Sequence, residues 1–228
     1  MWDNEKERKK KLEFKIKDLA NYGVITAKLD DEDMQYLWNA IEEGKKYNIS
    51  VNKRLAGNIS SSLAINDKDN RIFTYVCYFI QEYEKTFGRT YQLNTSYSSN
   101  RFSLDSFWVN FQKQNEFNPM HNHSGVYSFV IWMKIPTEWE EQRKLPIAKN
   151  SKYDKSIGNF SLIYTDILGG IRNTDVVMGK DKEGTLLLFP ASMPHLVNPF
   201  YNCDEERVSI SGNIHLKIEA KEDKTSNE

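Results

Sequence analysis

The spacing of apolar residues changes once along the chain, close to Gly88. Before this point apolar residues recur every three or four positions, the period of a helix with one buried face. The pattern predicts a helix through Leu12 and Leu19 that ends near Gly23, a strand over 24–29, a helix after Asp30 or Asp31, and a helix over 71–87. An aspartate at the start of the second helix can cap its free N–H groups.

After Gly88 the pattern becomes that of strands. Segments rich in β-branched and aromatic residues are separated by Gly, Asn, Asp and Pro. They lie near 91–97, 105–112, 125–135, 159–166, 173–178, 184–189 and 206–218. Successive strands without a helix between them predict an antiparallel sandwich or barrel. Residues 137–153 suggest an exposed loop that could act as a lid. The chain is therefore expected to be mainly β with N-terminal helices.

Composition narrows the class of protein and suggests a division of the chain. The 228 residues carry 31 basic and 32 acidic side chains, so the net charge of −1 gives no electrostatic reason to expect nucleic acid or a membrane as partner. No apolar run approaches the roughly 18 residues that span a bilayer, and the start lacks a signal-peptide pattern. We expect a cytoplasmic protein with a helical layer over 1–90, a β core over 91–219 and a disordered tail over 220–228.

The last predicted strand has two chemically different faces. Apolar residues and Gly212 occupy alternate positions from Val208, while Arg207, Ser209 and their polar successors occupy the others. Such alternation favours a strand with one apolar and one polar face. The polar face is either exposed to solvent or forms the start of a polar barrel interior. His215 shares that face but lies eight residues from Arg207, roughly 26 Å at about 3.3 Å per residue, so we exclude it from the site.

Three histidines are candidate metal ligands. His121 and His123 stand two apart, so in an extended segment their imidazoles point the same way and can bind one cation. His195 follows a hydrophobic strand and a turn between two prolines, where a third ligand can reach the same cation from another strand. Three such ligands can fill one side of an octahedron and leave the other open for substrate and oxygen.

Arg207 is the candidate anion-binding residue. Its guanidinium presents a planar fork of donors that can meet a carboxylate bidentately, and it stays charged at any working pH. Ser209 can add a hydroxyl donor from the same face. An exposed, salt-bridged arginine is the ordinary alternative for Arg207 taken singly.

Several runs around these residues resemble a known family. They are Phe117–Val130 with His121-Asn122-His123, Gly184–His195 with Phe189-Pro190 and Pro194-His195, Glu206–Asn213, Leu55–Ile59 and Trp108-Val109-Asn110. Together they resemble the 2-oxoglutarate/Fe(II)-dependent oxygenases common in bacteriophage genomes, over most of residues 50 to 215. The resemblance implies a double-stranded β-helix, a jelly-roll or cupin-like barrel with a helical N-terminal layer.

The resemblance also implies cofactors and roles. Fe(II) would be bound by His121 and His195, and 2-oxoglutarate would chelate it while Arg207 and Ser209 hold the distal carboxylate. We add Asn110 to the expected cosubstrate contacts. O2 would be the second cosubstrate, and the prime substrate is not identified. The wider superfamily usually has His-x-Asp or His-x-Glu where this chain has His123, so either His123 ligates iron or that position is vacant or filled by solvent.

Two other functions fit the same residues. The first is a cupin-like binding module that carries a structural metal or none and has no oxygenase activity. The second is a three-histidine dioxygenase that attacks its substrate directly, without 2-oxoglutarate. Arg207 discriminates between the oxygenase and the direct dioxygenase, because the latter has no need of a clamp for a dicarboxylate.

Overall fold

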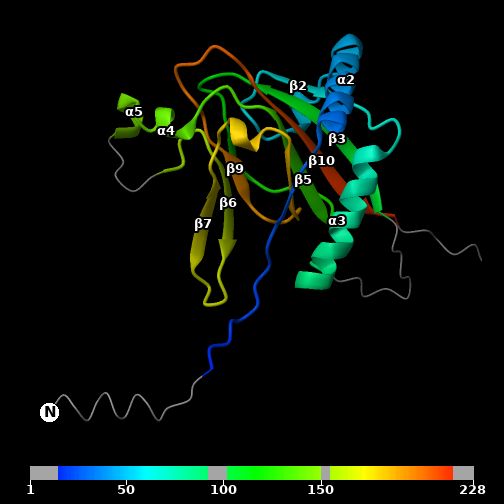
Figure 1. Cartoon of the computed structure of the whole chain (residues 1–228), viewed down its shortest axis with the longest axis vertical. Helices are drawn as coiled ribbons and strands as arrows, with labels where there is room; N and C mark the ends of the chain where they lie inside the picture. The colour runs from blue at the N-terminus through cyan, green and yellow to red at the C-terminus, as the bar shows by residue number, and fades with distance from the viewer. Residues whose placement is uncertain (1–14, 92–101, 150–154, 218–228) are drawn as a thin grey trace, which may run out of the picture.

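Two antiparallel sheets face each other at the centre of the molecule, as the computed structural model in Figure 1 shows for residues 15–91, 102–149 and 155–217. The larger sheet has the order β1 (Ile25–Lys28), β8 (Thr185–Pro190), β5 (Tyr127–Lys134), β10 (Arg207–Leu216), β3 (Phe102–Gln112) and β2 (Ser61–Ala64). The smaller sheet has the order β4 (Asn118–His121), β9 (His195–Val197), β6 (Phe160–Thr165) and β7 (Ile171–Val176). The predicted mainly β architecture is confirmed.

Two long helices cover the outer face of the larger sheet (Figure 1). They are α2 (Asp31–Tyr47) and α3 (Arg71–Phe87), and α3 has the bounds that the apolar stripe predicts. Asp30 caps α2 by accepting a hydrogen bond from the N–H of Asp33. Short helical turns complete the described elements: η1 (Asn52–Arg54), α4 (Trp139–Gln142), α5 (Pro146–Lys149) and η2 (Lys180–Lys182).

The larger sheet is buried on both faces, which explains the nearly continuous apolar sequences of β5 and β8. Alternate side chains such as Ile131 and Leu188 pack with the helices. Their neighbours, such as Trp132 and Phe189, pack between the two sheets with Phe160 of β6. The space between the sheets is therefore apolar along β5 and β8, and this apolar part borders the polar site described below.

The N-terminal part of the chain differs from the predicted helix that ends near Gly23. Residues 15–24 form no helix, and the part of the prediction before residue 15 lies outside the described residues. Ile16 and Leu19 are 86% and 68% exposed, so the apolar stripe has no surface to pack on, and a short helix without packing is marginal in water. The first 90 residues also supply β1 and β2, which pair with β8 and β3.

Residues 137–149 form short helices rather than a free loop. Buried Gln142 exchanges two hydrogen bonds with the backbone of Tyr201, at 2.9 and 2.8 Å, and so ties this segment to the body. Most of the predicted strand over 91–97, the end of the loop over 150–153 and the tail over 220–228 lie outside the described residues. None of the described helices is long and apolar enough to cross a membrane.

Candidate metal centre

The three predicted histidines lie together between the two sheets. One ring nitrogen of each of His121, His123 and His195 lies within 4.8 Å of the others, and the ring centroids are 4.3–5.0 Å apart. His121 and His195 face each other in the register of β4 and β9, and His123 follows β4 by two residues. The three imidazoles are therefore close enough to be candidate ligands of one cation.

Backbone carbonyls orient two of the imidazoles. Nδ1 of His121 lies 2.7 Å from the oxygen of Pro119, and Nδ1 of His195 lies 3.0 Å from that of Met193. A carbonyl can only accept, so Nδ1 carries the proton in both rings and Nε2 keeps a free lone pair. Metal-binding histidines are commonly oriented in this way. The side chains present therefore fit a transition-metal ion.

Burial keeps the three imidazoles neutral. Desolvation lowers the pKa of His121, and it lowers the pKa of His123 to about 4 and that of His195 to about 3, with a smaller contribution from the neighbouring rings. Phe160 stacks on the His195 ring at 5.3 Å and helps to exclude water from it. Neutral imidazoles have the lone pairs that a cation needs.

These shifts predict how the stability of the metal-free protein depends on pH. The unfolded chain has ordinary histidines with a pKa near 6.5, so below that pH the unfolded state binds more protons than the folded state. The contribution of these histidines to the free energy of unfolding is fully present above about pH 6.5. It is lost progressively as the pH falls toward their pKa values in the folded protein. We expect urea unfolding with a chelator present to show a lower free energy at pH 5 than at pH 7.5. The pH slope should be smaller in His123→Gln/His195→Gln, and an identical slope would contradict the prediction.

Arg207 lies fully buried in the same cavity as the histidines. Its guanidinium donates to Gln112 Oε1 from Nε and Nη2, at 2.9 and 2.6 Å, and to the carbonyls of Gly158 and Asn198. All of these acceptors are neutral, and no described carboxylate forms an ion pair with Arg207. Desolvation lowers the pKa of Arg207 to about 10, so it remains charged at neutral pH. The site thus contains a buried positive charge without a counter-ion among the described residues.

The hydrogen bonds of Arg207 limit how it can bind a carboxylate. A guanidinium has five N–H donors, and four are engaged by these contacts. The fork expected to grip a carboxylate is therefore largely occupied by the protein. Arg207 offers a carboxylate its charge and one remaining N–H, so a neighbour must supply a second donor.

Strands β10 and β3 place the other predicted residues on the same face. In their antiparallel register Arg207 lies opposite Gln112, Ser209 opposite Asn110, and Ser211 opposite Trp108. All six line one cavity of about 150 Å³ together with the three histidines. The apolar residues of β10 point the other way, into the layer of helices. The polar face of the last strand is therefore interior, and His215 is not among the residues that line this cavity.

Among the polar residues of the cavity that sequence reasoning missed are Gln112, Ser211 and Asn118. The first two could have been found, because they continue the alternation of Asn110 and Ser209. Asn118 belongs to β4, whose sequence has no alternation. The Asn118 amide oxygen packs so closely on Gly57 that a Cβ at residue 57 would lie 1.6 Å from it. This contact gives a physical reason for the glycine in Leu55–Ile59.

The comparison with protein families matches this part of the chain. Residues 106–213, which include the three histidines and Arg207, match the family model described as "Putative 2OG-Fe(II) oxygenase". These findings point to a 2-oxoglutarate/Fe(II)-dependent oxygenase. The three-histidine cluster fits Fe(II), and the family implies 2-oxoglutarate and O2 as cosubstrates of the oxygenase. No curated protein matches the chain.

Solved structures similar to this chain are distant in sequence. A 2OG-Fe(II) oxygenase family oxidoreductase from Burkholderia pseudomallei is 14% identical, with a TM-score of 0.35, and the match covers 50% of this chain and 44% of that one. A Pseudomonas putida prolyl-4-hydroxylase is 14% identical, with coverage of 84% and 91% and a TM-score of 0.48. A Trichoplax adhaerens prolyl hydroxylase is 11% identical, with coverage of 85% and 83% and a TM-score of 0.47.

Proposed function

We propose that the protein is a hydroxylase with a double-stranded β-helix core, in which His121, His123 and His195 bind Fe(II). In this proposal all three histidines are ligands, and His123 occupies the position where a carboxylate is usual. Arg207, Ser209 and Asn110 hold 2-oxoglutarate. A bacteriophage origin and a cytoplasmic location stay predictions.

The balance of charge in the cavity carries this proposal. The described residues that line it include no carboxylate, while Arg207 contributes one buried positive charge. Three neutral imidazoles would leave both charges of a bound Fe(II) uncompensated. Buried charges are costly unless they are paired. A dianion that reaches both the metal and Arg207 compensates two of these three positive charges, and 2-oxoglutarate has a carboxylate at each end.

The strand register supports an ordered arrangement of this dianion. Ser209 lies one position along the same face from Arg207, next to Asn110, and its hydroxyl can supply the second donor that Arg207 lacks. The Asn110 amide oxygen accepts from Ser62 Oγ at 2.8 Å, which fixes the orientation of that side chain. Trp132, Phe160 and Phe189 form an apolar wall that limits the access of water.

Bound Fe(II) supplies the redox chemistry with O2 in this proposal. The overall reaction converts a substrate C–H bond, O2 and 2-oxoglutarate into C–OH, succinate and CO2. The protein contributes placement of the cosubstrate and a dry cavity. The buried Arg207 facing this cavity speaks against the direct three-histidine dioxygenase, which needs no dicarboxylate anchor.

The experiment is an anaerobic titration of the protein with Fe(II) and 2-oxoglutarate. We expect a visible metal-to-ligand charge-transfer band that Arg207→Ala loses and His215→Ala keeps, because only Arg207 lines the cavity. Retained iron without a band or succinate would favour the direct dioxygenase. Failure to retain iron would favour the binding module and contradict the proposal.

A further inference from the structure

A second cavity, of about 470 Å³, adjoins the metal cavity. Both cavities are lined by Arg54, Leu55, Trp108, Asn122 and His123. His123 is one of the three clustered histidines, so the second cavity reaches the metal centre. Its volume lies within the range of about 300–1,000 Å³ that is usual for small-molecule sites.

The polar face of β3 and β10 continues from the first cavity into the second. The pairs Arg207–Gln112, Ser209–Asn110 and Ser211–Trp108 line the first, and the next pair, Asn213–Ser106, lines the second. Residues two apart in a strand are roughly 6.6 Å apart, so Arg207 and Asn213 are separated by about 20 Å. The anion-binding end and the second cavity therefore lie at opposite ends of one face, with the Trp108 and His123 positions between them.

Trp108 carries an unused hydrogen-bond donor at this junction. The residue is 5% exposed, and its indole Nε1 is one of two buried side-chain polar atoms without a partner among the described residues. An indole nitrogen can only donate, and a buried donor without a partner costs about 1–3 kcal/mol. The Trp108 ring lies 5.9 Å from the His123 ring. An acceptor oxygen that reaches Nε1 would satisfy this donor.

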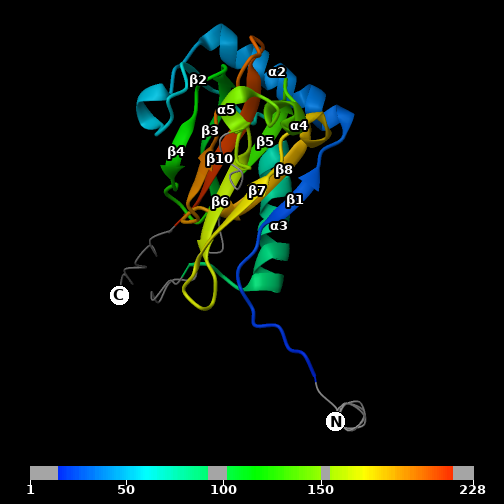
Figure 2. The ribbon, with the colours of Figure 1, turned by 90° about the vertical axis from the view of Figure 1, so that its left-hand side faces the viewer.

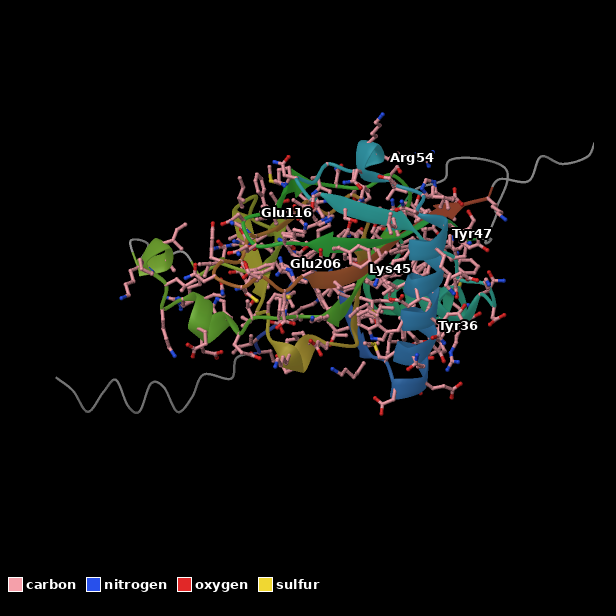
Figure 3. The ribbon with its side chains drawn as sticks, turned by 90° about the horizontal axis from the view of Figure 1, so that it is seen from above. Tyr36, Lys45, Tyr47, Arg54, Glu116 and Glu206 are labelled. Atoms are coloured by element: carbon pink, nitrogen blue, oxygen red, sulfur yellow. The ribbon has the colours of Figure 1, made fainter. Side chains whose placement is uncertain are left out.

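The lining of the second cavity favours an uncharged ligand. The polar side chains among its lining are mainly amides and hydroxyls, including Asn213 and Ser106, and the other lining residues are mostly apolar. Its one carboxylate, Asp105, accepts from Ser103 at 2.5 Å and lies 3.5 Å from His215 Nδ1. Arg54 also lines this cavity, but Figure 3 shows its side chain extending from η1 away from the sheets. Neither Asp105 nor Arg54 is therefore positioned to pair with an ionic group of a bound ligand.

We propose that the second cavity binds the prime substrate, and that the Trp108 N–H donates to an oxygen of an uncharged polar group on it, such as an amide or a hydroxyl. Calling the ligand the prime substrate depends on the proposed oxygenase function. The cavity and the Trp108 N–H donor are features of the structure that do not depend on it. The substrate would reach the metal from the side opposite the anchor for 2-oxoglutarate. Trp108 is then the residue that favours an acceptor group beside the oxidised carbon.

The test follows the Trp108 indole by NMR in protein labelled with ¹⁵N-tryptophan. The full chain is loaded with diamagnetic Zn(II) and 2-oxoglutarate, and a parallel sample contains neither. The Trp108 signal is the one that Trp108→Phe removes. N-Methylacetamide and glycerol serve as uncharged polar probes, with acetate and methylammonium as charged probes of similar size.

We expect the uncharged probes to move the Trp108 proton signal downfield and the charged probes to leave it in place. Ser106→Phe narrows the second cavity only, so it should weaken the response to N-methylacetamide at least about tenfold, a loss of about 1.4 kcal/mol. Arg207→Met lies at the far end, and in the sample without metal and 2-oxoglutarate it should change the response less than about twofold. A response lost in Arg207→Met but kept in Ser106→Phe would overturn the proposal.

Two further outcomes would also overturn this inference. One is a Trp108 signal that moves only with 2-oxoglutarate, and the other is a signal that no uncharged probe moves. Either could occur while the charge-transfer band is present, which leaves the proposed function intact. Conversely, absence of the band with a normal Trp108 response would reject the oxygenase function alone.

Discussion

Replacing Gln112 by glutamate will remove most of the affinity for 2-oxoglutarate, although Gln112 need not touch it. Gln112 Oε1 accepts two hydrogen bonds from Arg207 and leaves the charge of the guanidinium uncompensated. A carboxylate at this position would pair with Arg207 at hydrogen-bonding distance and compete with the cosubstrate. Loss of a charge-assisted contact costs about 2–3 kcal/mol, or about 30- to 150-fold in affinity.

The matched control is Gln112→Met, which has a similar size and no charge. It removes the two acceptor contacts but keeps Arg207 without a counter-ion, so we expect the affinity for 2-oxoglutarate to stay within a few fold of the original. Anaerobic titration of the charge-transfer band measures the affinity, and circular dichroism checks that both variants fold. Equal losses in the glutamate and methionine variants would mean that Gln112 acts through packing rather than charge.

The second large effect concerns the proposed metal ligands. His195→Ala removes a buried imidazole whose Nδ1 is already oriented by the carbonyl of Met193. Since loss of an outer partner of a ligand typically costs 10- to 100-fold in metal affinity, loss of the ligand itself should cost at least about 100-fold. Equilibrium dialysis with Fe(II) measures this, and His215→Ala is the histidine control outside the cavity.

His123→Asp tests whether His123, which stands where a carboxylate is usual, is a metal ligand. A carboxylate at this position would retain iron and lower the positive charge of the cavity. If His123 is a ligand, iron affinity stays within about tenfold and succinate is still formed, because either side chain can donate to iron. If His123→Ala binds iron as tightly as the original protein, His123 is not a ligand and the proposed three-histidine site is wrong.

The elements that could be predicted are those whose pattern is local. The bounds of α3 follow from a buried stripe that includes Ile72, Val76 and Ile80, and β10 follows from its alternation. The helix through Leu19 was predicted from the same kind of stripe and is wrong over residues 15–23, because periodicity does not say whether a packing partner exists. Strand β4 was not predicted, since Asn118-Pro119-Met120-His121 owes its conformation to pairing with distant β9.

In the candidate site, too, only the features that depend on local sequence could be predicted. His121, His195 and Arg207 could be proposed from residue chemistry and spacing, and the structure brings them into one cavity. The environment of Arg207 could not be predicted in this way, because its hydrogen-bond acceptors belong to Gln112, Gly158 and Asn198, up to 95 residues away in sequence. Sequence reasoning therefore indicates which groups can do the chemistry, while their charge balance depends on long-range packing.

The position of β10 between β5 and β3 has a consequence for synthesis of the protein (Figure 2). Its partners end 73 (β5) and 95 (β3) residues earlier in the chain, from 207 − 134 and 207 − 112, so the central gap of the larger sheet stays open until residues 207–216 leave the ribosome. Pairings of this separation form slowly. Until then the histidines have no anion anchor beside them and the cavity lacks one wall. Insertion of this single strand therefore completes the larger sheet and brings Arg207 into the cavity of the three histidines in one step.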